Sequence, residues 1–355
     1  MPTLRLPAEW EPQDAVLLAW PHAATDWKPY LPASQAACAQ LVAAITRHER
    51  VLLLTCAPGE SDAALRKAGA ILDRVTPLSI PTHDTWARDF GPLTVIEDGQ
   101  PVLLDFQFNG WGDKFPADLD NQVTANLKRH GVFGDRHVRS IHIVLEGGAI
   151  DSDGKGTILT TASCLANPNR LGRGNRADIE AALTRFLGAT RVCWLEHGAL
   201  AGDDTDGHVD MLARFAPHDT LVYTACDDPN DALYEELAAM AAELAALRTP
   251  QSQPYRLIPL PWPAPVFGER GERLPASYAN FLVINGAVLV PTYNDPVDSL
   301  ALAAIAQAFP GRRPEGVDCS LLIRQRGALH CAAMHLPKGT VVEPKPSGPS
   351  CGGRH

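Results

Sequence analysis

Residues 93–104 read LTVIEDGQPVLL, and this stretch decides the fold of the chain. Two runs of β-forming residues flank Asp98-Gly99, a dipeptide typical of tight hairpin turns. A helix-like segment from Leu119 to His130 follows, and Gly131 is well suited to end it. The run Ile141–Leu145 is again strand-like. The order strand, turn, strand, helix, strand predicts a ββαβ unit.

The same order recurs further along the chain. A second copy starts at Glu146, a third at His208 and a fourth at Phe281. Each copy has a β-rich run after a turn signal, followed by a helix-like segment. The helices predicted for these copies span residues 176–187, 231–247 and 298–309, with Asn230 and Asp298 as candidate N-caps.

A fifth copy is split between the two ends of the chain. An opening strand at Ala15–Trp20 and a helix near Ser34–His48 lie at the start, and a short strand follows Cys331. Pairing the two ends would close a ring and remove an exposed sheet edge. The sequence therefore predicts a five-unit α/β propeller in one domain, residues 1–338, with an ordinary mixed α/β sheet as the alternative. The Pro- and Gly-rich segment 339–355 is predicted to be a disordered tail.

Composition narrows the class of protein. The 355 residues carry a formal net charge of −10, which argues against a nucleic-acid surface and fits a cationic small molecule. The sequence has neither a signal-peptide pattern nor a long apolar run, so we expect no membrane partner. Its eight cysteines form no CxxC pairs, which favours reduced thiols and a cytoplasmic location. A homodimer is the default expectation, because symmetric dimers are the commonest assembly.

Each predicted unit opens with a polar residue just before or within its first strand. In a ring, equivalent positions point toward a common axis. His208 and Asp210 are two residues apart, which on a strand puts both side chains on one face. The residues that open the units are Asp89, Glu146, His208 with Asp210, Asn280 and Cys331.

This set of side chains suits an attack on a cationic carbon. Two carboxylates can hold a planar guanidinium through paired N–H···O bonds. Each contributes about 4 kcal/mol of attraction at about 4 Å and an effective dielectric near 20. A thiolate can attack the central carbon, and a histidine can protonate the departing ammonia and then deprotonate water. The sequence therefore predicts a cysteine-dependent deiminase of a guanidino compound.

Several motifs, in the same order, resemble those of the agmatine deiminase family. The resemblance extends over about residues 5 to 337, nearly the whole chain. Its motifs are EWEP at 9–12, DTWARDFGP at 84–92, EGG at 146–148, DTDGHVD at 204–210, ERLPASYANF at 272–281 and HC at 330–331.

The resemblance implies a five-bladed α/β propeller of the guanidino-group-modifying superfamily. It also implies hydrolysis of agmatine to N-carbamoylputrescine and ammonia, in putrescine biosynthesis, with no cofactor and no metal. Cys331 would be the nucleophile, forming a covalent thiouronium intermediate, and His208 the acid and base. Asp89 and Asp210 would clamp the guanidinium, and Glu146 would contact the substrate or orient His208. The residues expected to bind substrate are Trp86, Asp89, Asp204, Asp210 and Asn280, with core packing as the alternative for Trp86.

Two departures from the family pattern leave the substrate open. Many members continue after the nucleophile as HCITQQxP, whereas residues 330–337 here read HCAAMHLP. Many also have Gly-Gly where this chain has Arg326-Gly327. Asp204 and Asp206 favour an ammonium group, and so agmatine, unless they only shape a turn. Arginine, peptidyl-arginine and amidino transfer to an amine remain alternatives.

Two readings from other classes compete with a deiminase. His208, Asp210, Cys331 and Asp89 could form a mixed zinc site, although no usual zinc-ligand spacing supports it. Alternatively, the acids could bind a polyamine without catalysis, the thiol being structural.

Overall fold

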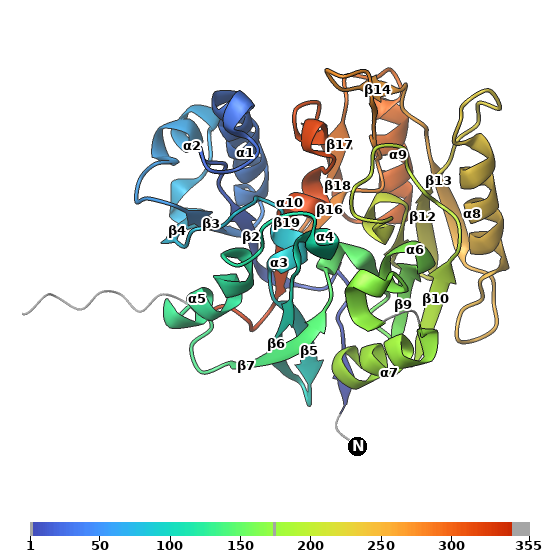
Figure 1. Ribbon diagram of the computed structural model, residues 1–355, viewed down its shortest axis with the longest axis horizontal. Coiled ribbons are helices and arrows are strands. Elements are labelled where there is room, and N and C mark those ends of the chain that lie inside the picture. The colour runs from blue at the N-terminus through green and yellow to red at the C-terminus, as the bar shows by residue number, and fades with distance from the viewer. Residues whose placement is uncertain (1–2, 173–174, 343–355) are drawn as a thin grey trace, which may run out of the picture.

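The computed structural model describes residues 3–172 and 175–342, which form a mixed α/β fold (Figure 1). The stretch at 93–104 is a hairpin of β5 (Leu93–Glu97) and β6 (Gln100–Gln107), turning at Asp98-Gly99 as predicted. β7 (His137–Val144) then pairs with β6 in parallel. An antiparallel pair followed by a parallel strand is therefore the basic unit of this protein.

The same sheet order recurs along the chain, and each later unit again starts with a hairpin. The first pair of strands is antiparallel and the third strand joins in parallel. These sheets contain β8 (Ile150–Ser152), β9 (Thr157–Thr161) and β10 (Arg191–Leu195); β11 (Ala213–Ala216), β12 (Thr220–Thr224) and β13 (Arg256–Leu260); and β16 (Leu282–Ile284), β17 (Ala287–Thr292) and β18 (Arg313–Asp318).

The two ends of the chain share one sheet. β19 (Ala333–Pro337) runs antiparallel to β2 (Gln13–Ala19), with Ala333 opposite Leu18. The predicted pairing of the chain ends is therefore confirmed. The remaining strands are β3 (Arg50–Thr55) and β4 (Val75–Ser79) in this sheet, β1 (Leu4–Arg5) beside β5, and the separate pair β14 (Val266–Phe267) and β15 (Arg273–Leu274).

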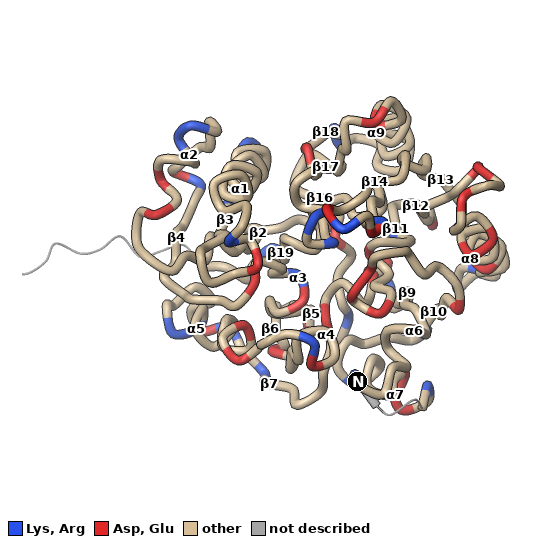
Figure 2. The backbone as a smooth tube through the Cα atoms, turned by 45° about the horizontal axis from the view of Figure 1, so that its top comes forward, with Lys and Arg blue, Asp and Glu red and all other residues tan. Residues whose placement is uncertain are grey.

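Helices connect the parallel strands, and Figure 1 shows the longer ones at the periphery. These are α1 (Leu31–Thr46), α2 (Asp62–Ala68), α5 (Val123–Arg129), α7 (Arg176–Leu187), α8 (Tyr234–Ala246) and α9 (Asp298–Ala308). Short helices lie toward the middle of the molecule, where Figure 2 shows charged positions of both signs on α3. The short helices are α3 (Ala87–Phe90), α4 (Gly110–Asp113), α6 (Ala162–Leu165) and α10 (Leu329–Ala332).

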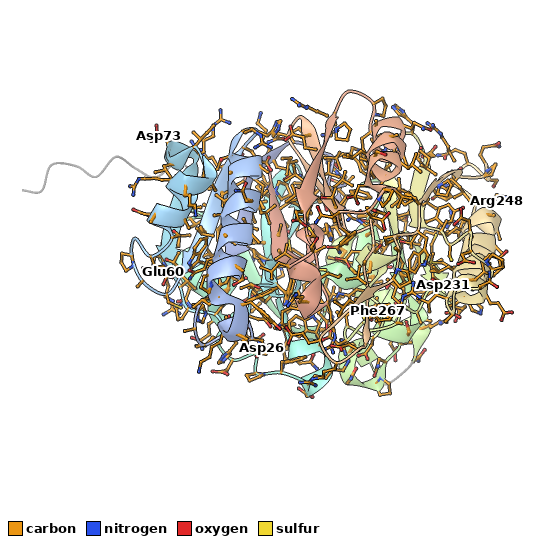
Figure 3. All side chains as sticks on the ribbon, turned by 90° about the horizontal axis from the view of Figure 1, so that it is seen from above. Asp26, Glu60, Asp73, Asp231, Arg248 and Phe267 are labelled. Carbon is orange, nitrogen blue, oxygen red and sulfur yellow. The ribbon has the colours of Figure 1, made fainter. Side chains whose placement is uncertain are left out.

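Both predicted N-caps are wrong. α8 begins at Tyr234, and the Asn230 side chain donates to Asp228 instead of capping the helix. Asp231, near the start of α8 in Figure 3, forms ion-paired hydrogen bonds of 2.8 Å with Arg273. Asp298 is the first residue of α9, and its carboxylate accepts from Tyr278 and from the Tyr293 backbone. A tertiary partner has thus recruited the Asp298 carboxylate, whereas the Asn230 side chain binds within its own loop.

The first residues of the predicted tail pack against the domain. The Val341 N–H donates to Asp14, and the Val342 N–H donates to the Val132 carbonyl. The rest of that segment, 343–355 with Cys351, lies outside the described residues. In the part of the chain that is described, none of the helices combines the length and apolar character needed to cross a membrane.

Candidate active site

The polar residues predicted to open the units are buried just ahead of the first strand of each sheet. They lie on short helical turns or loops, not within the strands. His208 directly precedes a 3-10 turn, Val209–Met211, and Asp210 lies within it, so the strand periodicity used to place them together is wrong. They are nevertheless both fully buried. The whole set consists of Asp89, Glu146, His208, Asp210, Asn280 and Cys331.

Gly148 marks the point where three of these side chains converge. A Cβ atom built on Gly148 would lie 2.6 Å from His208 Nδ1 and 3.0 Å from both Asp210 Oδ2 and Asp89 Oδ1. A Cβ on Gly147 would lie 2.3 Å from the Arg88 carbonyl oxygen. The Glu-Gly-Gly sequence is thus needed because side chains crowd this backbone. A larger residue here would displace the acids and the imidazole.

Cys331 lies on α10 with its sulfur among polar groups. The Asn280 amide nitrogen is 3.1 Å from Cys331 Sγ, and Asp210 Oδ2 is 3.6 Å from it. The Asn280 side-chain oxygen also accepts from the backbone N–H groups of His330 and Cys331. Burial and the charges of Asp210 and Asp89 raise the pKa of the Cys331 thiol well above its ordinary value. The thiol is therefore protonated when no cation is nearby.

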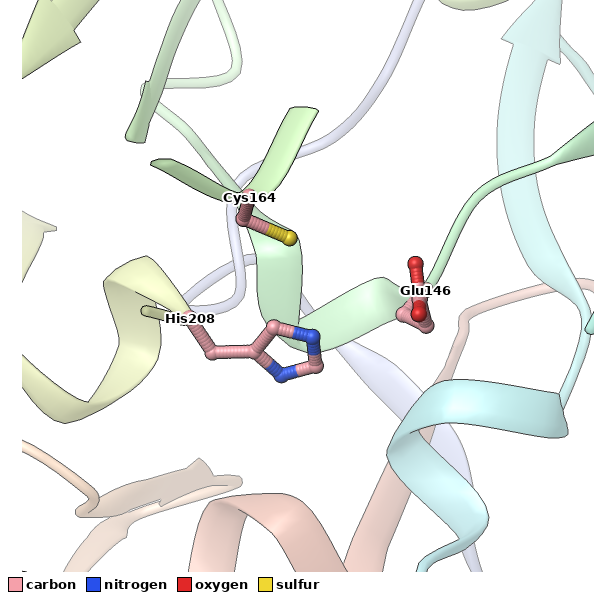
Figure 4. A group of neighbouring side chains, drawn as sticks. All are labelled: Glu146, Cys164 and His208. Carbon is pink, nitrogen blue, oxygen red and sulfur yellow. The ribbon is translucent and has the colours of Figure 1, made fainter. Parts of the chain in front are cut away.

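His208 is buried with free ring nitrogens. Neither nitrogen has a hydrogen-bond partner among the described residues, and Nδ1 is 3.7 Å from Asp89 Oδ1. Figure 4 shows the ring turned toward Cys164 and Glu146. Burial opposes a charge on this imidazole, but Asp89, Cys164 and Glu146 outweigh burial and raise its pKa well above the ordinary value. An imidazole in this setting can carry a proton and release it to a ligand.

The two predicted clamp aspartates are held differently. Asp89 accepts from Trp111 Nε1 at 2.9 Å and from the Gly148 N–H at 3.0 Å. Burial raises the pKa of Asp89 to about 6, against the opposing effect of His208. Burial acts the same way on Asp210, but the hydrogen bond and charge of His330 lower its pKa overall. Asp210 is thus an anion at neutral pH with or without a ligand.

Several buried polar atoms in this site have no partner within the described part of the chain. Such atoms are rare in folded proteins unless water or a ligand satisfies them. Together they offer two carboxylate oxygens and an imidazole beside a thiol, which suits a cation with several N–H donors. These atoms are Glu146 Oε2, Asp210 Oδ1, His208 Nδ1 and His208 Nε2.

A group of possible metal ligands overlaps this site, but it differs from the zinc site considered from the sequence. Donor atoms of Glu146, Cys164 and His208 all lie within 4.8 Å of one another, and these are zinc-type ligands. However, Arg170 Nε lies 2.5 Å from Glu146 Oε1. Its positive charge opposes a divalent cation at the same carboxylate. The Arg170 ion pair therefore favours a site for an organic ligand.

Two predicted substrate contacts have protein partners of their own. Trp86 is buried, with its ring centroid 6.1 Å from that of Trp27. Its ring also lies so near Gly327 that a Cβ there would come within 2.5 Å. Asp204 accepts from Arg326 Nη1 at 2.9 Å. Both residues therefore already have partners within the protein, and Arg326 is the residue that departs from the family pattern.

Sequence reasoning missed the supporting residues. Arg170 binds Glu146, and Glu9 lies 2.6 Å from His330, whose other ring nitrogen faces Asp210. No periodicity marks Arg170, which follows α6 in irregular backbone. Glu9 and His330 lay within quoted motifs, and a search for charged residues inside those motifs would have found them.

Comparisons with known proteins bear on the family of this chain. The profile of the family "Porphyromonas-type peptidyl-arginine deiminase" matches residues 5–337. A curated protein from Marinomonas sp. (strain MWYL1), provisionally named agmatine deiminase, is 32% identical, and the match covers 96% of each chain. The C. jejuni agmatine deiminase, solved as a Cys-to-Ser variant with substrate bound, is 36% identical, with a TM-score of 0.87 over 95% of this chain and 97% of that one. A Porphyromonas gingivalis structure provisionally named arginine deiminase is 45% identical, with a TM-score of 0.90 over 96% of this chain and 100% of its own.

Proposed function

Because this chain belongs to the Porphyromonas-type peptidyl-arginine deiminase family, we propose that it hydrolyses agmatine to N-carbamoylputrescine and ammonia. The observation that carries the proposal is the group of unpartnered buried atoms around the Cys331 thiol. A guanidinium supplies the N–H donors that these atoms lack. The agmatine deiminases among its relatives favour agmatine as the compound that brings it.

Asp210 and Asp89 hold the cation in this proposal. Asp210 turns its free Oδ1 toward the ligand, and Asp89 shares the region near Gly148 with His208. Each carboxylate contributes about 4 kcal/mol at about 4 Å and an effective dielectric near 20. Glu146 offers its second oxygen, while its first stays bound to Arg170. These carboxylates fix the orientation of the guanidinium plane relative to the Cys331 sulfur.

Arrival of the cation activates the thiol. Asp210 and Asp89 raise the pKa of Cys331 in the free site, and a bound guanidinium offsets their charge. Cys331 then releases its proton to solvent, and its sulfur bonds to the central carbon. His208 gives its proton to the departing nitrogen, the C–N bond breaks, and ammonia leaves. The product of this half-reaction is a thiouronium on Cys331.

Water completes the reaction. His208, now neutral, takes a proton from water as its oxygen attacks the thiouronium carbon. The C–S bond breaks, the departing thiolate takes up the remaining hydroxyl proton, and the ureido product carries the oxygen as C=O. The enzyme thereby acts as a hydrolase of a C–N bond, with neither cofactor nor metal in the cycle.

Arginine or peptidyl-arginine is the second candidate substrate. The observation that favours it is the Arg326–Asp204 pair, because Arg326 occupies the carboxylate that an ammonium would need. Ammonia release, measured across agmatine, arginine, a methylated arginine and a peptidyl-arginine, separates the candidates. We expect the highest kcat/KM with agmatine. A higher kcat/KM with a carboxylate-bearing substrate would assign the second function, and no release from any of them would refute a deiminase.

We also propose a detailed architecture, a cellular location and an assembly for this chain. The recurring sheet order, closed by β19 and β2, supports a five-bladed propeller in a single domain over residues 1–338. A ring of this kind puts the residues ahead of each first strand near its axis, which agrees with the convergence at Gly148. A role in putrescine formation in the cytoplasm, as a homodimer, completes the proposal.

A further inference from the structure

His330 bridges two buried carboxylates next to the nucleophile. Its Nδ1 is 2.7 Å from Asp210 Oδ2, and its Nε2 is 2.6 Å from Glu9 Oε2. The same Asp210 oxygen is 3.6 Å from Cys331 Sγ. A continuous line of contacts therefore runs from Glu9, near the start of the chain, through His330 and Asp210 to the sulfur.

The two short contacts constrain the protonation of His330. A neutral imidazole has one N–H, so one contact would then set a bare nitrogen against a carboxylate oxygen, with lone pairs facing each other. An imidazolium donates at both nitrogens, and the distances are those of charge-assisted hydrogen bonds. The geometry therefore requires the doubly protonated ring as long as Glu9 and Asp210 are ionised.

The balance of charges around His330 also indicates that its ring is doubly protonated. Arg214 Nη2 is 2.8 Å and Arg88 Nη2 is 3.4 Å from Glu9 Oε2. Arg214 Nε also binds Asp151 at 2.8 Å. Three carboxylates thus meet two guanidinium groups, and a protonated His330 makes the sum zero. The carboxylates of this buried ion cluster are Glu9, Asp151 and Asp210, and its guanidinium groups are Arg88 and Arg214.

A second histidine in the cluster adds no charge. His335 Nδ1 is 3.0 Å from Arg88 Nη1 and 3.9 Å from Glu9 Oε2. Burial and the neighbouring charge of Arg88 lower the pKa of His335 to about 3, so this ring is neutral. The charged and titratable groups around His330 are therefore Glu9, Asp210, Arg88, Arg214 and the neutral His335.

We propose that Glu9 and His330 are positioning residues, in which Glu9 keeps His330 protonated so that His330 orients Asp210 and offsets its charge beside Cys331. This inference rests on the proposed function for the roles of Asp210 and Cys331. With Oδ2 bound to His330, Asp210 presents only Oδ1 to the substrate. The imidazolium also weakens the repulsion between Asp210 and a thiolate, which makes the sulfur easier to ionise.

The protonation state can be measured in the unmodified protein. We expect ¹⁵N NMR of the histidine rings at about pH 7 to show His330 protonated at both nitrogens. The Glu9→Gln and His330→Asn variants assign the signal. A neutral His330 ring at about pH 7 in the wild type would overturn the proposal, whether or not any variant folds.

Variants then test the effect on the nucleophile. Glu9→Gln keeps the shape but removes the charge that holds the proton on His330. We expect alkylation of Cys331 by iodoacetamide to require a higher pH than in the wild type, and kcat to fall about tenfold to a hundredfold. His330→Asn, which keeps a donor toward Asp210, should retain more activity than His330→Ala. Unchanged alkylation and unchanged kcat in a folded Glu9→Gln protein would refute the proposal.

Glu11→Gln is the matched control for Glu9→Gln. Glu11 lies two residues further along the same segment, where it binds the half-exposed Arg5 and does not contact the ion cluster. We expect this variant to keep the wild-type pH profile of alkylation. The alkylation and NMR readouts need no turnover, so they separate this proposal from the deiminase assignment: a wild-type protein that releases no ammonia would refute the activity and leave the His330 measurements intact.

Discussion

Two buried histidines flank the nucleophile, and they are held in opposite ways. Both nitrogens of His330 face carboxylate oxygens within 2.7 Å. Neither nitrogen of His208 has a hydrogen-bond partner among the described residues. Burial alone does not distinguish them, because both rings are almost completely removed from solvent. The hydrogen bonds do: a ring with two fixed partners can hold charge and geometry, whereas a ring with none can pass a proton to something that enters.

Replacement of Cys331, the proposed nucleophile, gives the largest predicted effect. Cys331→Ala should lower ammonia release by at least about a thousandfold, since the thiol that forms the proposed covalent intermediate is lost. The variant should stay folded, because the change removes only the sulfur atom, which contacts Asn280, Asp210 and Met211. Cys319→Ala is the control, as Cys319 is also buried but lies outside the site. Residual turnover near the wild-type value would remove Cys331 from the mechanism.

The contrast between the two histidines predicts unequal losses. His208→Gln should lower kcat by about a hundredfold to ten-thousandfold, because proton transfer to ammonia and from water is lost. His330→Asn should cost less, since it affects the chemistry only through Asp210. Steady-state ammonia release on both variants measures the difference. Equal losses would mean that the hydrogen-bond pattern does not separate the working imidazole from the positioning one.

The raised pKa of Asp89 predicts that activity falls on the acid side of the pH profile. Burial raises its pKa to about 6, so the carboxylate takes up a proton as the pH falls through that value. The clamp then loses a negative charge, and kcat/KM for agmatine should fall below about pH 6. A kcat/KM profile from the acid side to neutrality checks this. Asp89→Asn should have a low kcat/KM without that fall. A fall that persists unchanged in Asp89→Asn belongs to another group.

Arg326 gives the smallest predicted effect, through its ion pair with Asp204. Arg326→Gly frees the Asp204 carboxylate, so KM for agmatine should fall about twofold to tenfold while KM for arginine does not fall. The backbone tolerates this change, because Arg326 has φ +66°, a conformation that glycine adopts without strain. Arg324→Ala, which removes the neighbouring pair with Glu269, serves as the control. Parallel changes for both substrates would show that the pair has no role in selection.

Much of the fold could be predicted from local sequence. Asp98-Gly99 turns the first hairpin, Gly131 follows the end of α5 with φ +75°, and the strand after Cys331 pairs with the one near Leu18. The helix caps could not be, because the Asn230 side chain binds Asp228 before α8 and the Asp298 carboxylate accepts from Tyr278 and the Tyr293 backbone. Local signals report on turns and ends, and tertiary contacts override them where a carboxylate has a better partner.

The site was predictable for the residues that open the units and not for those behind them. His208 and Asp210 were placed together for a wrong reason, strand periodicity, although both are in the site. Arg170 was missed because a buried guanidinium in irregular backbone leaves no pattern. Glu9 lies more than three hundred residues from His330 along the chain, and only the closed sheet brings them into contact. Periodicity in the sequence cannot identify residues that support a site from a distant part of the chain.

The pairing of β19 with β2 has a consequence for how the enzyme is made. The proposed nucleophile is synthesised long after Glu9, because 321 residues separate Glu9 from His330 along the chain. The ring of contacts around Asp210 cannot exist until the late strand docks on the early one. Contacts of such long range form slowly. A partly folded chain therefore carries Cys331 as an ordinary thiol without the proposed site around it, and the proposed chemistry requires this late docking step.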